Sequence, residues 1–247
     1  MKKTLFQLPA RAFLSLVVAL VATLQAGAAA AAPVTEEMVG DADSFGRNVR
    51  YLGVAQTIPI QMQDDCTGAP PEVRCVTLAA APAVTTFTEV DLESIELPGR
   101  STKSLICFAV TPFVSFQFQN DTGVSQPSAQ FNVTLDVTIE NELLDDAALI
   151  NPQTGLPFGG ELTVPLSTYR ESRSMAAGER AFKQLTLSRN CVGGIVSKES
   201  LAGTFGLPED VVEDFFKKDI LVRFGARGTA QLVSFANDSI GVRLYGD

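Results

Sequence analysis

The chain has 247 residues, with 19 Lys or Arg, 28 Asp or Glu and no His, so its formal net charge is −9. Hydrophobic residues make up 46% of it and charged residues 19%, which is typical of a globular protein and excludes a disordered or collagen-like chain. The absence of His excludes Ser-His-Asp catalysis, Cys-His catalysis and His-ligated zinc. The acidic balance also argues against nucleic acid as a partner, because phosphate contacts need clustered Lys and Arg.

Residues 1–31 have the pattern of a secretory signal peptide. Three cationic residues flank the start, an apolar run covers 12–22, and an Ala-rich stretch follows, with cleavage expected around Ala29 to Ala31. A membrane anchor is the alternative, but the apolar run is shorter than the roughly 20 residues that span a bilayer. We therefore expect a bacterial protein that is periplasmic or extracellular, with 32–247 as one domain, a net charge of −12 and no transmembrane segment after cleavage.

Four cysteines follow the signal segment, namely Cys66, Cys75, Cys107 and Cys191. An even number of cysteines in an exported chain indicates disulfides. Three pairings are possible, and we favour Cys66–Cys75 with Cys107–Cys191, because the first pair brackets a short loop rich in Gly and Pro. A metal or redox site is the alternative, but no Cys-x-x-Cys occurs.

The first half of the mature chain predicts strands. Short β-like runs cover 49–55, 57–63, 73–78 and 89–97, the last closed by Pro98-Gly99. Residues 104–119 form an apolar stretch interrupted by Pro112, which predicts a core strand that is bent or bulged at the proline. From 130 to 140, apolar and polar residues alternate without exception, which is typical of an antiparallel strand with one buried face.

The second half predicts more strands and one helix. Residues 143–160 are loop-like, and strands are expected over 161–165 and 181–187 around an Arg- and Ser-rich turn, and over 191–196. Pro208, an acidic first turn and Lys217-Lys218 in the last turn predict a helix whose apolar stripe covers a sheet edge or barrel end. Three further strands are expected over 220–224, 229–236 and 239–245, the last two joined by a turn at Asn237-Asp238.

Together these elements predict an all-β fold, an antiparallel β-sandwich or jelly-roll-like domain with one short C-terminal helix.

A possible calcium site lies near the start of the mature chain. The segment from Asp41 to Gly46 resembles the opening of a calcium loop, with carboxylates at its first and third positions and Gly at its sixth. Leu52, however, stands where such a loop needs a bidentate Glu, so Asp41 and Asp43 would need ligands from elsewhere in the fold. A capped turn is the alternative for this segment, and no other cofactor is expected.

Paired carboxylates could support catalysis without His, because glycoside hydrolysis needs two acids in one cleft. The candidates are Asp64-Asp65, Asp91 with Glu93, Glu140 with Glu142, and Asp145-Asp146; Asp91 and Glu93 are expected to share a strand face. A solvated face or turn is the alternative for each pair. The absence of Trp and the presence of just three Tyr weaken a glycosidase or lectin, since sugar rings commonly stack on large aromatics.

One cationic cluster, Arg170, Arg173, Arg180 and Lys183, alternates with Glu171 and Glu179. It could receive an acidic partner, but the alternation favours a solvated hairpin.

Lacking a catalytic constellation, the sequence favours a non-enzymatic function. We expect a disulfide-stabilised structural or interaction protein of the bacterial envelope or extracellular matrix, whose partner is a protein, a cell-surface component or another copy of itself. The alternative is a carbohydrate- or calcium-binding β-sandwich module.

Overall fold

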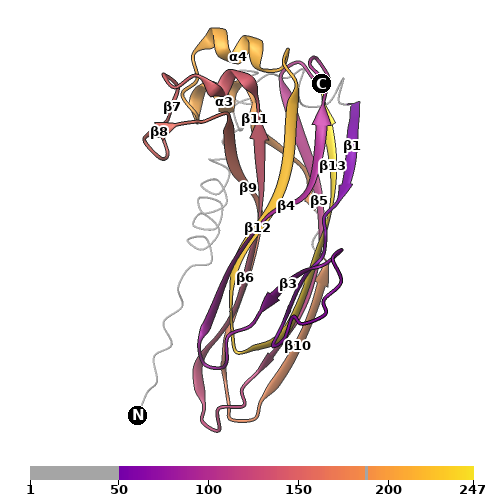
Figure 1. Ribbon diagram of the computed structural model, residues 1–247, viewed down its shortest axis with the longest axis vertical. Helices are drawn as coiled ribbons and strands as arrows, with labels where there is room; N and C mark the ends of the chain where they lie inside the picture. Colours follow the sequence, from indigo (N-terminus) through magenta and orange to yellow (C-terminus); the bar gives the residue numbers. More distant parts are fainter. Residues whose placement is uncertain (1–49, 187–188) are drawn as a thin grey trace, which may run out of the picture. The chain divides into compact units, whose positions relative to one another are not determined.

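The computed structural model describes residues 50–186 and 189–247, without the side chains of 189–195 (Figure 1). The predicted signal peptide and the segment with Asp41 and Asp43 lie outside these residues. Two sheets form a β-sandwich, which confirms the predicted fold class. Every strand pair is antiparallel except β2 with β3.

Sheet A has the order β10-β5-β13-β2-β3, with β1 also beside β13 and β11 also beside β5. Its strands are β1 (Arg50–Gln56), β2 (Ile60–Gln63), β3 (Arg74–Thr77), β5 (Leu105–Gln119), β10 (Arg180–Thr186), β11 (Arg189–Ser197) and β13 (Val233–Gly246). Sheet B has the order β4-β12-β6-β9. Its strands are β4 (Val84–Leu97), β6 (Gln126–Glu140), β9 (Glu161–Met175) and β12 (Ile220–Gln231).

The remaining elements gather at one end of the sandwich, as Figure 1 shows. They are the 3-10 helix η1 (Glu142–Asp145), the short strands β7 (Ile150–Asn151) and β8 (Leu156–Pro157), and the helices α3 (Lys198–Gly203) and α4 (Glu209–Phe215). We call this end of the sandwich the helical half and the opposite end, which holds β2, β3 and β10, the distal half.

Helix α4 closes the helical half. Pro208 precedes its first residue as the N-cap, and the buried side chains of Val212, Phe215 and Phe216 pack into the core, which confirms the predicted covering role. The helix ends at Phe215, so Lys217 and Lys218 follow the helix instead of occupying its last turn.

The core is divided into two apolar clusters, one in each half. The helical cluster includes Phe108 and Val110 of β5 and Ile240 and Val242 of β13. The distal cluster includes Phe116 of β5, whose ring stacks on Phe131 at 4.5 Å between centroids and meets Phe118 edge to face. The same strands therefore pass through both clusters.

Two predicted interruptions of strands, the turn after 165 and the bulge at Pro112, are wrong. Strand β9 runs without a break to Met175, so no turn begins after 165. Pro112 causes no bulge, because β5 pairs with β13 in continuous register on both sides of it. On the other side of β5, the ladder to β10 ends at Phe113 and the ladder to β11 ends at Val110. Pro112 lies in the gap between these ladders, where no strand needs a hydrogen bond from its missing N–H.

The predicted turn at Asn237-Asp238 is also wrong, because both residues lie inside β13. The turn between β12 and β13 lies instead at Leu232, whose φ is 54°. Asp238 pairs with Val114 of β5 and Ile60 of β2, so the long ladder to its neighbours overrides the turn preference of Asn and Asp.

Candidate functional site

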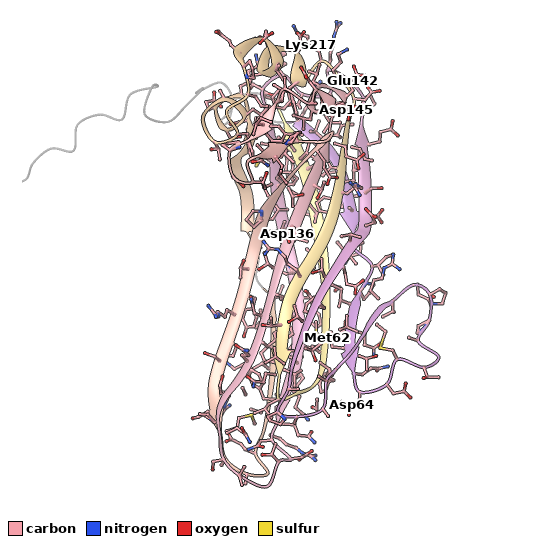
Figure 2. The ribbon with its side chains drawn as sticks, turned by 60° about the vertical axis from the view of Figure 1, so that its left-hand side comes forward. Met62, Asp64, Asp136, Glu142, Asp145 and Lys217 are labelled. Carbon is pink, nitrogen blue, oxygen red and sulfur yellow. A yellow bond between two sulfur atoms is a disulfide. The ribbon has the colours of Figure 1, made fainter. Side chains whose placement is uncertain are left out.

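An acidic cleft of about 840 Å³ lies at the helical half. Its charged lining consists of six carboxylates and two lysines, namely Glu96, Glu140, Glu142, Asp145, Glu161, Asp219, Lys217 and Lys218. Figure 2 labels Glu142, Asp145 and Lys217 at this end of the sandwich. The sequence analysis named Glu140, Glu142 and Asp145 as candidate acids, and the structure places all three in this cleft.

The buried side chain of Asn141 holds the cleft together. Its carboxamide oxygen accepts a hydrogen bond from the N–H of Leu143 and starts η1, while its nitrogen donates to the carbonyls of Phe215 (3.0 Å) and Asp219 (3.3 Å). One amide thus ties the end of β6 to the segment that follows α4. The position of η1 relative to Lys217 and Lys218 therefore depends on Asn141.

Two glycines allow the backbone to approach closely around the cleft. A Cβ on Gly99 would lie 2.4 Å from the carbonyl oxygen of Lys217, and a Cβ on Gly160 would lie 2.6 Å from Oδ1 of Asp145. Gly160 also has a φ of 90°, which L side chains rarely adopt. The N–H of Gly99 donates to Oδ1 of Asp219, which fixes that carboxylate at the wall of the cleft.

Both lysines of the cleft are already neutralised. Lys218 pairs with Glu142 (2.7 Å), and Lys217 pairs with Asp214 outside the cleft (2.6 Å). The hydrogen bond from Lys218 to Glu142 raises the pKa of Lys218, and the hydrogen bond from Lys217 lowers the pKa of Asp214. Two other carboxylates of the lining, Glu96 and Asp145, have no cationic partner among the described ion pairs, so the cleft keeps an excess of negative charge.

The acidic surface continues along the outer face of sheet B. Arg223 of β12 pairs with three carboxylates, namely Asp91 of β4 (2.9 Å), Glu161 of β9 (2.7 Å) and Glu140 of β6. One cation shared by three anions leaves this network negatively charged. A second hollow of about 350 Å³ adjoins it, and Glu161 lines both hollows.

The predicted shared face of Asp91 and Glu93 is wrong. Strand β4 bulges between Glu89 and Glu93, and Asp91 lies inside this bulge. The register between β4 and β12 shifts between Phe224 and Ala226 of β12, and Asp91 has a φ of 54°. Gly225 of β12 accommodates the bulge, since a Cβ there would lie 2.9 Å from the carbonyl oxygen of Glu89. The bulge ends the strict alternation and directs Asp91 to Arg223.

The same face carries a well-ordered ion pair at its centre. Arg227 donates from Nε to Oδ2 of Asp136 (2.6 Å) and from Nη2 to Oδ1 (3.3 Å), a bidentate arrangement midway along the sandwich (Figure 2). The hydrogen bond to Asp136 raises the pKa of Arg227.

The other candidate acids form turns. Oδ1 of Asp65 accepts from the N–H of Thr67, which lowers the pKa of Asp65, and Oδ1 of Asp146 accepts from the N–H of Ala148. Asp64 is exposed and lies just before Cys66, outside the loop that the disulfide closes. These acids do not join the cleft.

Two of the four cations of the cationic cluster are paired with glutamates. Arg173 pairs with Glu179 (2.5 Å) and Lys183 pairs with Glu171 (2.8 Å). Glu171 also accepts from the hydroxyl of Tyr169; burial, with that bond, raises the pKa of the phenol. Because β9 and β10 belong to different sheets, these contacts close one side of the sandwich and do not form a solvated hairpin.

The predicted Cys66–Cys75 disulfide is present, with 5.7 Å between the Cα atoms. Cys107 is also disulfide-bonded, whereas the side chain of Cys191 lies outside the described residues. The backbone register pairs Val192 of β11 with Phe108 of β5, which sets the segments of these two cysteines side by side. Their pairing remains a prediction.

Asp41 and Asp43 lie outside the described residues, so the calcium site remains a prediction. Within 50–186 and 189–247, no group of three or more Cys, Asp or Glu side chains could hold a metal ion. No helix in the described part of the chain is long and apolar enough to cross a membrane.

One unusual acid was missed by the sequence analysis. Asp238 is 2% exposed and lies between the two apolar clusters, with Ile240 of the helical cluster on one side and Ala236 of the distal cluster on the other. Neither of its carboxylate oxygens has a hydrogen-bond partner, and burial raises its pKa to about 7. Its isolation makes it a destabilising group and not part of a catalytic pair.

Comparisons with known proteins add no family. No protein-family model and no curated protein matches the sequence. Among solved structures, the chain matches the D431N mutant VP2 protein of infectious bursal disease virus, from derived T=1 particles, at 8% identity and a TM-score of 0.17. The match covers 80% of this chain and 36% of the viral one, and a TM-score this low supports no argument about fold or function.

Proposed function

We propose that this chain is an exported, non-enzymatic structural or interaction protein of the bacterial envelope or extracellular matrix, and that its acidic cleft docks a cationic segment of a protein partner. The observation that carries the proposal is the lining of the cleft, with six carboxylates against two lysines that are themselves paired. An excess of fixed negative charge in a concave site attracts cations and excludes anionic partners.

The arrangement of the cleft favours binding over hydrolysis. A glycosidase needs one protonated carboxyl group as general acid and a second carboxylate as base or nucleophile. Glu140 and Glu161 instead share Arg223, and Glu142 is paired with Lys218. All three acids are thus already engaged in ion pairs. None of the residues lining the cleft is aromatic, which also disfavours a sugar as ligand.

The test is the binding of a fluorescently labelled octalysine peptide to the mature protein, followed by fluorescence anisotropy at increasing salt. We expect affinity that falls as salt rises, because exposed charges are screened. The double variant Glu96→Gln, Asp145→Asn removes two of the three lining carboxylates that make no ion pair among the described residues, and it should weaken binding at least fivefold. These two side chains make no ion pair among the described residues, so their loss should leave the fold intact.

The matched control replaces two carboxylates on other surfaces, Glu72→Gln and Glu199→Gln, which changes the net charge equally. Equal weakening by the control and the cleft variant would mean that octalysine senses overall charge, and the proposed docking site would be wrong. Export is tested separately, by recovering the full chain from periplasm or medium with residues 1–31 removed.

A further inference from the structure

The distal half of sheet A presents an outer face with a continuous uncharged stretch. Outward positions can be assigned because even-numbered residues from Val110 to Phe118 of β5 are buried and the register fixes their neighbours. We call this surface the neutral face. Its outward residues are Gln56, Gln61, Thr111, Phe113, Ser115, Gln117, Phe182, Gln184, Thr186, Phe235, Asn237, Ser239 and Gly241. They are all uncharged in a chain of net charge −9, and the outward arginines Arg180 and Arg243 lie just beyond the ends of this stretch.

Three phenylalanines make the neutral face unusually apolar. Phe182 is 57% exposed, and Phe113 and Phe235 are each 36% exposed. Phe182 and Phe235 flank Gln117 on its two neighbouring strands, and their rings lie 6.0 Å apart. Aromatic side chains exposed together on a surface free of charge are typical of the centre of a protein interface.

Two amides of the neutral face are held by side chains that lie beside it. Nε2 of Gln117 donates to Oε1 of Gln119 and to the hydroxyl of Ser234, both at 3.1 Å. Nε2 of Gln61 donates to Oε1 of Gln63, also at 3.1 Å. Covering these two amides with another surface would therefore leave them hydrogen-bonded, which lowers their share of the desolvation cost of an interface.

Electrostatics identify the occupant. Two copies of this acidic chain repel one another when their cleft ends or the outer faces of sheet B approach, because like charges then meet. On the neutral face that repulsion is smallest. Pairing through the free edge of β10 is disfavoured, since Arg180 and Lys183 lie on that strand and edge charges oppose strand addition.

We infer that the neutral face is an interface between two copies of this chain, which pack sheet A against sheet A in a symmetric dimer. The face spans four strands about 4.8 Å apart and about seven residues of about 3.4 Å each, so it covers roughly 450 Å² per copy. An interface of this size is small, and we expect a reversible dimer that forms in the micromolar to millimolar range.

The test is light scattering after size-exclusion chromatography of the mature protein, loaded at increasing concentration. We expect the measured mass to rise from one chain to two, with little dependence on salt because the interface carries no charge. Phe182→Glu and Phe235→Glu place charges at the centre of the face and should each abolish the rise. Val90→Glu, on the exposed bulge of β4, is the control and should dimerise as the wild type does.

Circular dichroism and thermal unfolding of each variant separate loss of the interface from loss of the fold. A wild-type protein that stays monomeric up to millimolar concentration would overturn the inference, and so would folded Glu variants that dimerise normally. A monomer that instead binds an insoluble neutral polysaccharide, and loses that binding in the same two variants, would assign the face to carbohydrate and equally refute the dimer.

Discussion

The helical half and the distal half of this sandwich use the same strands for different surfaces. At the helical half, η1, α3 and α4 cover the core, and the loops around Asn141 form an acidic cleft. At the distal half the sheets are not covered by helices, the core is held by stacked rings around Phe116, and sheet A has a neutral outer face. The difference teaches that the core positions set the fold and the outward positions set what each half can bind.

Buried polar side chains lie at the boundary between the two halves, where an apolar core would be expected. Thr57, which is 2% exposed, donates from its N–H to the carbonyl of Ile240 and accepts from the N–H of Ile240, so its polar groups are satisfied. Asp238 lies two residues before Ile240 on β13, and neither of its carboxylate oxygens has a hydrogen-bond partner. The two halves are thus joined by continuous strands, and the buried carboxylate of Asp238, which destabilises the fold, lies between their apolar clusters.

The largest effects are expected from two matched core truncations on β5. Phe108 of the helical cluster and Phe116 of the distal cluster are both fully buried, so Phe108→Ala and Phe116→Ala should each lower the free energy of unfolding by about 3–5 kcal/mol. Phe116→Ala should cost about 1 kcal/mol more, because its ring also contacts Phe118 and Phe131. Urea denaturation measures both.

Because the strands are shared, each truncation should shift one cooperative transition. If either variant splits the unfolding curve into two steps, the halves are independent units.

The next effect concerns the boundary and depends on pH. The pKa of Asp238 is about 7 in the folded protein against an ordinary value of 3.8, so folding favours its protonated form. Its contribution is most favourable below pH 4, declines as pH rises to 7, and is unfavourable by roughly 4 kcal/mol above that. Asp238→Asn should therefore stabilise the protein at pH 8 and flatten the change between pH 4 and 7.

Urea midpoints measured from pH 4 to 8 check this expectation, with Asp64→Asn, at an exposed position just before Cys66, as control. A variant that keeps the slope of the wild type would show that Asp238 is not the titrating group.

A smaller effect is expected at the wall of the cleft. Gly99→Ala places a methyl group against the carbonyl of Lys217, so the segment after α4 must shift, at a cost of about 1–3 kcal/mol. Gly203→Ala, in helix α3, meets nothing within 4 Å and serves as the control. Thermal unfolding should separate the two variants, and equal melting temperatures would contradict the close approach seen at Gly99.

The smallest effect is expected on the outer face of sheet B. Arg227→Gln removes the bidentate partner of Asp136 and should cost about 1 kcal/mol or less, because the arginine is 57% exposed. The difference between variant and wild type should shrink in high salt. A loss that is larger, or insensitive to salt, would show that this pair supports the core.

The sequence predicted the repeating features of the fold well and its exceptions poorly. The alternation from Phe131 to Ile139 and the proline before α4 are local signals, and both elements are present. The Asn237-Asp238 turn was wrong because a long ladder can hold turn-forming residues in a strand, and no local signal reveals that ladder. The β4 bulge at Asp91 likewise depends on Gly225, a residue on another strand.

The candidate site was predicted only in part, for the same reason. Glu140 with Glu142, and Asp145 with Asp146, were predicted as two separate pairs of sequence neighbours, whereas Glu96, Glu161 and Asp219 reach the cleft from other strands and loops. The pairing of the acids with Arg223 and Lys218 was not foreseen, since it joins residues far apart in the chain.

The most direct test of the account measures both surfaces in the same samples, by titrating octalysine into wild type, the Glu96→Gln, Asp145→Asn variant and the Phe182→Glu variant while recording mass by light scattering. We expect the cleft variant to lose octalysine binding and still dimerise, and the Phe182 variant to stay monomeric and still bind octalysine. A cleft variant that binds octalysine as tightly as wild type, or a variant that loses both properties while folded, would contradict the assignment of separate roles to the two halves.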